Sequence, residues 1–209
     1  MSTTSINCPS CGGNLEVRHR FSKMVVCPYC NQSTFLNTDG LLAQGEKVKL
    51  IDYGSVFFIG ATGTLKHLKF EVIGRIRYKY ADGFWDEWLL IIDDLEGEEL
   101  WLQEDEGEFI LFKRKQVLKN LPPYSQTKVG SVIDVNGEAV FITEKSKAYV
   151  MGGEGELFFQ ITPGEQADYI DGILYGKGIP VNIEYLPEEV VFNIGEELFL
   201  DDIKFSREV

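Results

Sequence analysis

Cysteine and histidine are scarce in this chain of 209 residues. All four cysteines lie within the first 30 residues, a distribution that excludes the disulfide framework of a secreted domain and favours a metal site near the N-terminus. The two histidines are His19 and His67, and we expect His67 to be a surface or packing residue because lysines surround it. A phosphate-binding glycine loop and a nucleophile elbow are also missing. The sequence therefore shows no assembled enzyme site.

Long apolar segments are missing as well. No uninterrupted apolar run approaches the roughly 20 residues of a membrane-spanning helix. The first ten residues, MSTTSINCPS, have neither the cationic start nor the apolar segment of a secretion signal. From these absences we expect a soluble, cytoplasmic protein that is not integral to a membrane.

Basic residues are few compared with acidic ones. Lys and Arg total 20 and Asp and Glu total 33, so the formal net charge is −13. This balance disfavours nucleic acid and anionic membranes, and it favours a basic protein or a cationic small molecule as the partner. The acids are densest between Asp93 and Glu108, a stretch without Lys or Arg. Such a cluster indicates either a surface that binds cations or solvated turns that discourage edge pairing.

The four cysteines have the spacing of a metal site. They form two C-x2-C pairs that are fifteen residues apart, namely Cys8, Cys11, Cys27 and Cys30. This pattern is typical of four-thiolate zinc centres. Gly12 and Asn31, which directly follow the two pairs, tolerate the left-handed conformation needed to leave each turn. The sequence therefore predicts a zinc ribbon over residues 1–40.

The expected role of the ion is structural. Four thiolates complete the tetrahedron around Zn²⁺ and leave no position for a catalytic water. A unit of about 30 residues buries too little apolar surface to fold unaided, so the metal supplies its stability. Redox chemistry, catalysis and nucleic-acid contact through the basic residues of the ribbon are the alternatives, and iron is the alternative metal.

The rest of the chain reads as short strands separated by turns. Residues 70–112 predict a β-meander, with turns at Ala81–Gly83, Glu96–Gly97 and Glu106–Gly107. Further strands are expected over residues 50–59 before it, and the pattern continues to residue 203 after it. The strands expected at the start of the second half cover residues 138–144, 147–151 and 156–162.

The expected fold class is mainly β, with the zinc ribbon followed by an all-β domain over residues 48–203. The meander would close into a barrel-like or a sandwich domain. Two prolines after residue 121 mark a boundary, and the segment Val129-Gly-Ser-Val132 is similar to Tyr53-Gly-Ser-Val56. This similarity indicates a weak repeat, with residues 48–119 and 127–203 as two related halves.

Two carboxylates lie between tryptophans in the segment Trp85–Trp88. Adjacent residues of a strand point to opposite faces, so only one of the two shares a face with a given cluster. If Glu87 points inward it needs a partner, and Arg75 and Arg77 on the preceding strand are the candidates. We expect Asp86 and Glu87 to be structural, with a catalytic acid as the alternative.

Several motifs of the β region carry a family resemblance. They are Val72-Ile-Gly-Arg75, Trp85-Asp-Glu-Trp88, Gly97, Trp101-Leu102, Tyr169-Ile-Asp171, Asn182-Ile-Glu-Tyr185 and the segment Phe192–Leu200. With these motifs the chain resembles, over residues 48–203, a bacterial family known only as a domain of unknown function. The resemblance implies no established activity and no catalytic residues. Members are similar in sometimes carrying a zinc ribbon, and they are associated with bacterial gene clusters for membrane-stress proteins and polyamine-synthase-like enzymes.

From the sequence we expect a binding or assembly module, an adaptor, and not an enzyme. The structural zinc ribbon would support the β domain, and the resemblance implies an accessory role in membrane-stress or polyamine-linked systems. The first alternative is a hydrolase, or an enzyme that binds polyamine or metal, with an acidic cleft near Trp85–Trp88. The second alternative is nucleic-acid contact through the ribbon.

Overall fold

The computed structural model describes residues 4–37, 42–92, 100–117, 121–186 and 189–206. Within these ranges the regular secondary structure is almost entirely β-strand, and the only helices are two short 3-10 helices, η1 (Tyr124–Gln126) and η2 (Leu200–Asp202). The expected mainly β class is confirmed. It follows from the many β-branched and aromatic residues and from the glycine turns between them.

The described ranges contain no helix long and apolar enough to cross a membrane.

The strands fall into three groups along the chain. The N-terminal group is β1 (Thr4–Asn7), β2 (Asn14–Val17), β3 (Met24–Val26), β4 (Gln32–Leu36) and β5 (Leu42–Lys47). The second group is β6 (Thr62–Leu65), β7 (Leu68–Lys79), β8 (Phe84–Ile92), β9 (Leu100–Asp105) and β10 (Glu108–Lys115). The third group is β11 (Val132–Val135), β12 (Glu138–Leu157), β13 (Gln166–Leu174), β14 (Pro180–Tyr185), β15 (Val190–Leu198) and β16 (Ile203–Phe205).

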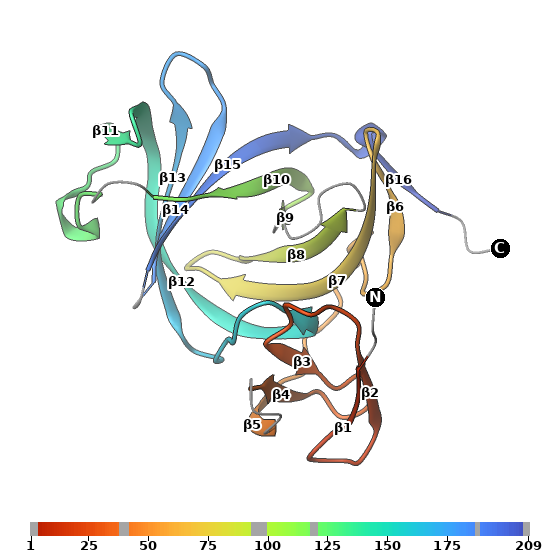
Figure 1. Cartoon of the computed structure of the whole chain (residues 1–209). Coiled ribbons are helices and arrows are strands. Elements are labelled where there is room, and N and C mark those ends of the chain that lie inside the picture. The colour runs from red at the N-terminus through yellow and green to blue at the C-terminus, as the bar shows by residue number, and fades with distance from the viewer. Residues whose placement is uncertain (1–3, 38–41, 93–99, 118–120, 187–188, 207–209) are drawn as a thin grey trace.

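Eight of these strands close into an antiparallel barrel (Figure 1). Its order is β7, β8, β9, β10, β15, β14, β13 and β12, and β12 pairs with β7 to complete the ring. Two four-stranded meanders therefore meet at two seams, β10 with β15 and β7 with β12. Closure removes the open edges that a flat sheet would expose. The structure thus decides between barrel and sandwich in favour of the barrel.

Strand β12 joins the barrel to the ribbon. It is one continuous strand of 20 residues where the sequence predicted three short ones. Its first part pairs with β11 and β13, and its last part pairs with β7 and then with β3 of the ribbon. Gly155 has a φ of 71°, and a Cβ atom there would lie 2.1 Å from the carbonyl oxygen of Ile73. Only glycine permits this close crossing of the two strands.

The segment over residues 50–59 is not a strand, so that prediction is wrong. Polar groups of this segment form hydrogen bonds with side chains of the barrel and not with a neighbouring strand. Arg77 donates to the carbonyl oxygen of Ile51 at 2.7 Å, and Ser55 donates to Glu104 at 2.6 Å. Phe57 is buried against the outer face of the barrel. The apolar residues of this segment therefore cover the barrel as a strap.

Both halves begin with the same local geometry. The backbone N–H groups of Gly60 and Gly130 donate to the second strand of the hairpin that follows, at 2.8 and 2.9 Å. Lys66 and Asn136, in the turns of these hairpins, have φ values of 54° and 56°. Gly60 in the first half therefore corresponds to Gly130 in the second half. The two Gly-Ser-Val motifs align Gly54 with Gly130 instead, so the sequence similarity does not follow the structural correspondence.

The apolar residues of the described ranges form four clusters: one inside the barrel, two outside it and one within the ribbon. The inner cluster, with Trp85, Trp101 and Phe112, fills part of the barrel and includes Met24 and Val26 of the ribbon. One outer cluster lies between β7–β9 and the strap with β6 and β16. The other lies between β12–β15 and β11. The ribbon therefore has a small core of its own around Leu15 and Val25, and it contributes Met24 and Val26 to the interior of the barrel.

Candidate ligand cavity and metal centre

The four cysteines come together at one point of the ribbon. Each offers one sulfur atom, and these atoms all lie within 4.8 Å of one another. The Sγ atoms of Cys8 and Cys30 are 3.7 Å apart, as are those of Cys11 and Cys27. Four thiolates about 2.3 Å from one ion in a tetrahedron have S–S separations of about 3.8 Å. The donor set therefore fits a tetrahedral metal ion and is too open for disulfide bonds.

Two similar turns present these sulfur atoms. The N–H of Gly12 donates to the carbonyl of Cys8, and the N–H of Asn31 donates to the carbonyl of Cys27, both at 2.8 Å. Gly12 and Asn31 have φ values of 74° and 58°, which confirms the left-handed conformation expected for both. Each turn aims two thiolates at the same point, as the C-x2-C spacing predicts.

The ribbon is fixed to one end of the barrel through Glu156. This carboxylate is only 5% exposed and accepts hydrogen bonds from the backbone N–H groups of Arg18 and His19 and from the hydroxyl of Ser22, at 3.1, 3.2 and 2.7 Å. Nothing in the sequence identifies Glu156, because the residues it binds lie more than 130 positions away. Together with the pairing of β3 and β12, this contact seats the ribbon on the barrel.

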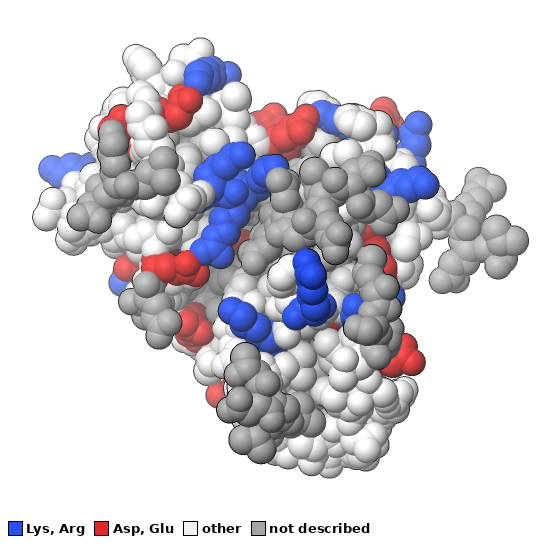
Figure 2. Space-filling view, in the orientation of Figure 1, with Lys and Arg blue, Asp and Glu red and all other residues white. Residues whose placement is uncertain are grey.

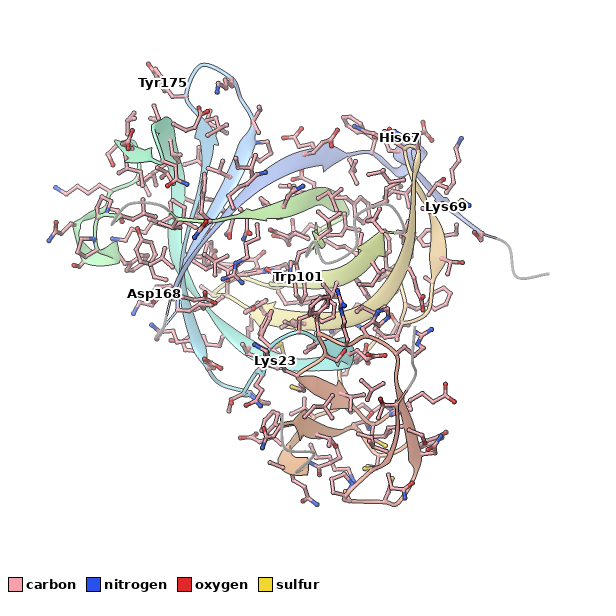
Figure 3. The ribbon with its side chains drawn as sticks, in the orientation of Figure 1. Lys23, His67, Lys69, Trp101, Asp168 and Tyr175 are labelled. Carbon is pink, nitrogen blue, oxygen red and sulfur yellow. The ribbon has the colours of Figure 1, made fainter. Side chains whose placement is uncertain are left out.

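A cavity of about 530 Å³ occupies the interior of the barrel. All eight strands of the ring contribute residues to its lining. Its apolar wall includes Tyr78, Trp101, Phe112, Val150 and Phe159. The size is within the range of small-molecule sites, and an apolar wall with a few polar groups is their usual composition. Figure 3 shows Trp101 near the middle of the view, above Lys23 of the ribbon.

Carboxylic acids line the polar side of this cavity. Burial, followed by repulsion from Glu184, raises the pKa of Glu87 well above its ordinary value, although the indole N–H of Trp85 donates to it at 3.0 Å. Burial raises the pKa of Glu184 to about 7, and the charge of Asp171 adds to this shift. Burial also raises the pKa of Asp171 to about 6. Because an opposite charge favours the ionised form, a cation in the cavity would lower all three pKa values.

A row of amides connects the cavity to Asp171. Asn193 on β15 donates to Asn182 on β14 at 3.2 Å, and Asn182 donates to Asp171 on β13 at 3.0 Å. These residues are direct partners in the strand register, so their side chains share the inner face of the sheet. The alternation of polar and apolar residues in each strand is the one sequence signal that could have indicated this row.

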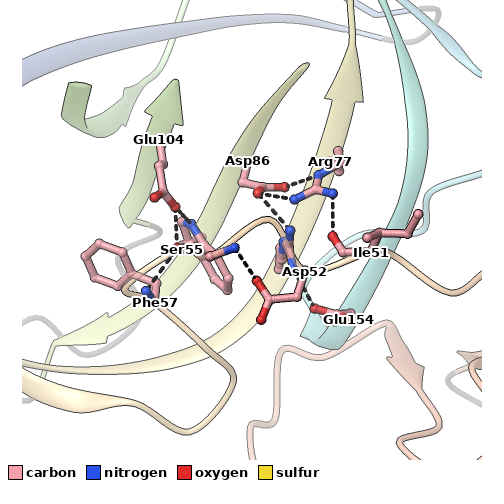
Figure 4. Close-up of polar contacts among 11 residues, drawn as sticks. Ile51, Asp52, Ser55, Phe57, Arg77, Asp86, Glu104 and Glu154 are labelled. Atoms are coloured by element: carbon pink, nitrogen blue, oxygen red, sulfur yellow. Dashed lines mark hydrogen bonds and ion pairs between the residues drawn. The ribbon is translucent and has the colours of Figure 1, made fainter. Parts of the chain in front are cut away.

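The expectation that Glu87 pairs with Arg75 or Arg77 is wrong. Asp86 is their partner: it accepts from Nη2 of Arg75 at 2.8 Å and from Nε and Nη2 of Arg77 at 2.8 and 2.6 Å (Figure 4). Arg77 lies directly opposite Asp86 in the pairing of β7 with β8, so the two share the outer face. Glu87 points the other way, into the cavity.

The acidic run between Asp93 and Glu108 is described only in part, because residues 93–99 lie outside the described residues. Within the described part, Glu104 accepts hydrogen bonds from the indole N–H of Trp88 at 2.9 Å and from Ser55 at 2.6 Å (Figure 4). Glu104 therefore fastens the strap to the barrel. His67 is exposed in the turn between β6 and β7, away from the cavity, as expected of a surface residue (Figure 3).

Comparison with known proteins identifies a family without a known activity. The family model described as "Domain of unknown function (DUF4178)" matches residues 59–198. This range contains β6 to β15 and so the whole ring of the barrel, whereas the ribbon lies before it. No curated protein and no solved structure matches the chain.

Proposed function

The chain belongs to the family of the domain of unknown function DUF4178, and on that premise we propose that its barrel is a binding module for a small organic cation. The observation that carries the proposal is the pair Glu87 and Glu184 inside the cavity. Neither forms an ion pair with any residue that the structure describes. Arg114 lowers the pKa of Glu184 from a distance, but its guanidinium is ion-paired with Glu189 at 2.5 Å. A bound cation would supply the missing charge.

The walls of the cavity support an organic cation over a metal ion. Trp101, Phe112 and Tyr78 line it, and aromatic faces attract ammonium groups by cation–π interaction. Among the described residues, the cysteine cluster is the one group of three or more metal-ligating side chains whose donor atoms converge. The acids of the cavity are therefore too dispersed to enclose a divalent ion, whereas an extended amine reaches them separately.

Such a module binds its ligand without changing it, which is the accessory role that we propose for the protein. The alternative is the hydrolase with an acidic cleft, because Glu184 with a pKa of about 7 has the value of a general acid or base. We place the protein in the cytoplasm, since a reducing compartment keeps the four cysteines out of disulfide bonds and available as metal ligands.

Calorimetry with cadaverine and spermidine tests the proposal on the full-length protein. We expect binding to strengthen about tenfold as the pH rises from 6 to 8, because Glu184 must lose its proton to pair with the amine. Binding should release protons, so the measured heat should depend on the ionisation enthalpy of the buffer.

The variant Glu184→Gln should lower the affinity at pH 8 by about tenfold or more, because it removes a charge-assisted hydrogen bond. Glu197→Gln, which changes an exposed carboxylate on β15 in the same way, should have no effect. Failure of both amines to bind at any pH, or equal binding by the two variants, would contradict the proposal. Mass spectrometry of the recovered amine separates binding from turnover, and its consumption would favour the hydrolase.

For the cysteine cluster we propose a structural Zn²⁺. The support is the four-sulfur donor set, with separations of 3.7 Å that fit a closed tetrahedron. Elemental analysis of protein purified without chelators should find one zinc per chain. A content of iron in place of zinc, or of no metal after refolding with zinc, would overturn this assignment.

A further inference from the structure

Lys23 is the residue of the ribbon that lines the cavity of the barrel. Its main chain is fixed on both sides: its N–H donates to the carbonyl of Leu157 on β12, and its carbonyl accepts from the N–H of Leu36 on β4, both at 2.8 Å. Figure 3 shows Lys23 where the ribbon meets the barrel, below Trp101. The barrel therefore sets the position of this lysine, although it belongs to the ribbon.

The ammonium group of Lys23 is carried by an exposed side chain that lines the cavity. It forms no ion pair with any residue of the described ranges, in contrast to Arg114, the other cation of the cavity lining, which is paired with Glu189. In Figure 2 the basic side chains gather over the middle of this face, between the barrel strands and the ribbon, although the chain as a whole is acidic. Lys23 therefore brings one unpaired positive charge, among the described residues, to a cavity that Glu87, Glu184 and Glu165 also line.

We infer that the ligand carries a carboxylate as well as an ammonium group, and that Lys23 determines this specificity. The inference rests on the proposed function, which supplies the ammonium site at Glu87 and Glu184. A simple amine leaves the charge of Lys23 unpaired in the same cavity and is repelled by it. A zwitterion pairs with Lys23 through its carboxylate and with Glu87 and Glu184 through its ammonium group. The ligand class is thus an amino acid, or a small derivative of one, whose apolar part lies against Trp101 and Phe112.

Pairs of ligands that differ by one carboxylate test this inference. L-Lysine is compared with cadaverine, L-leucine with isoamylamine, and L-phenylalanine with phenethylamine, by calorimetry at pH 8 on the metal-loaded, full-length protein. In at least one pair the amino acid should bind about tenfold or more tightly than its amine, which corresponds to about 1.4 kcal/mol. Amines that bind as tightly as their amino acids, or more tightly, would overturn the inference and leave the cation site intact.

Substitution of Lys23 provides a second test of the inference. Lys23→Met keeps the length of the side chain and the main-chain contacts but removes the charge. It should lower the affinity for the amino acid about tenfold and leave the amine unchanged or bound more tightly. Lys69→Met, at an exposed lysine far from the cavity (Figure 3), should change neither.

The outcomes separate the two proposals. If Lys23→Met lowers the affinity for the amino acid and for the amine equally, Lys23 does not recognise the carboxylate and the inference fails. If neither member of any pair binds, and cadaverine and spermidine fail as well, the cation site itself is refuted together with the inference. Binding of the amines without binding of the amino acids refutes only the carboxylate of the ligand and leaves the cation site standing.

Discussion

Replacing Asp86 by asparagine is expected to lower the free energy of unfolding by about 3–5 kcal/mol. Asp86, Arg75 and Arg77 are 4%, 4% and 2% exposed, so three charges are removed from water on the outer face of β7 and β8. The single carboxylate accepts from both guanidinium groups. Asparagine keeps its shape but not its charge, and it leaves two buried cations without their shared partner.

The damage should extend to the strap over residues 50–59. Arg77 binds the carbonyl of Ile51 and lies against the rings of Tyr53 and Phe84, at 4.9 and 4.2 Å from their centroids. If Arg77 loses Asp86, it no longer has a fixed orientation for these contacts. Hydrogen exchange of the strap should therefore accelerate in the variant before the barrel unfolds.

Chemical denaturation of the two proteins measures the effect. The matched control is Glu138→Gln, which makes the same change in an exposed ion pair with Lys177 at 2.7 Å. It should cost less than about 1 kcal/mol, because solvent screens exposed pairs. A loss of similar size in both variants would show that the buried group of three charges does not stabilise this face of the barrel.

Replacing Cys27 by serine is expected to release the metal and to destabilise the barrel together with the ribbon. Metal binding contributes about 10–16 kcal/mol to the folding of zinc-finger peptides, so the ribbon should unfold without it. Cys27 directly follows β3, whose residues Met24 and Val26 pack in the core that the barrel shares. Exposing the buried Met24 alone should cost the barrel about 2–5 kcal/mol, as large-to-small changes in a core do.

Two measurements test whether the stability of the barrel depends on the ribbon. Thermal unfolding of the metal-loaded protein should show one transition, and in Cys27→Ser that transition should move to lower temperature. The amides of Glu156 and Leu157 on β12 should lose protection from hydrogen exchange, because β3 no longer pairs with this end of the strand. A barrel that keeps its melting temperature after the metal is lost would show that the ribbon is an independent unit.

The variant Glu156→Gln separates loss of the metal from loss of the contact between the ribbon and the barrel. It leaves all four cysteines in place but weakens the charged acceptor that binds three donors of the ribbon. Zinc should stay bound, while the barrel should lose about 1.5–3 kcal/mol for the charged hydrogen bonds. If this variant instead loses the metal, the ribbon depends on the barrel for its own fold. The division at residues 40–48 stays a prediction until such data exist.

Local signals made much of the architecture predictable. The hairpin of β7 and β8 and that of β9 and β10 turn where Ala81–Gly83 and Glu106–Gly107 indicate, since the turn residues and the flanking apolar runs are neighbours in the sequence. The cysteine cluster was predictable for the same reason, because each C-x2-C pair forms one turn. The continuous strand over residues 138–157 was missed, since its polar interruptions resemble turns and only its partners on both sides keep it extended.

The residue pattern alone thus decided the mainly β class, the turns at Ala81–Gly83 and Glu106–Gly107, the cysteine cluster and the excess of acid. Alternation along β8 required Asp86 and Glu87 to face opposite sides, but it did not say which side would be the inside. That choice was made by pairings between distant residues, at the β7–β12 seam and at the β10–β15 seam. Closing the ring placed Glu87 beside Glu184 in the cavity, left Asp86 to the two arginines, and brought Lys23 to the cavity from the other end of the chain. Contacts of this kind leave no local pattern, because each depends on how far the barrel curves before its edges meet.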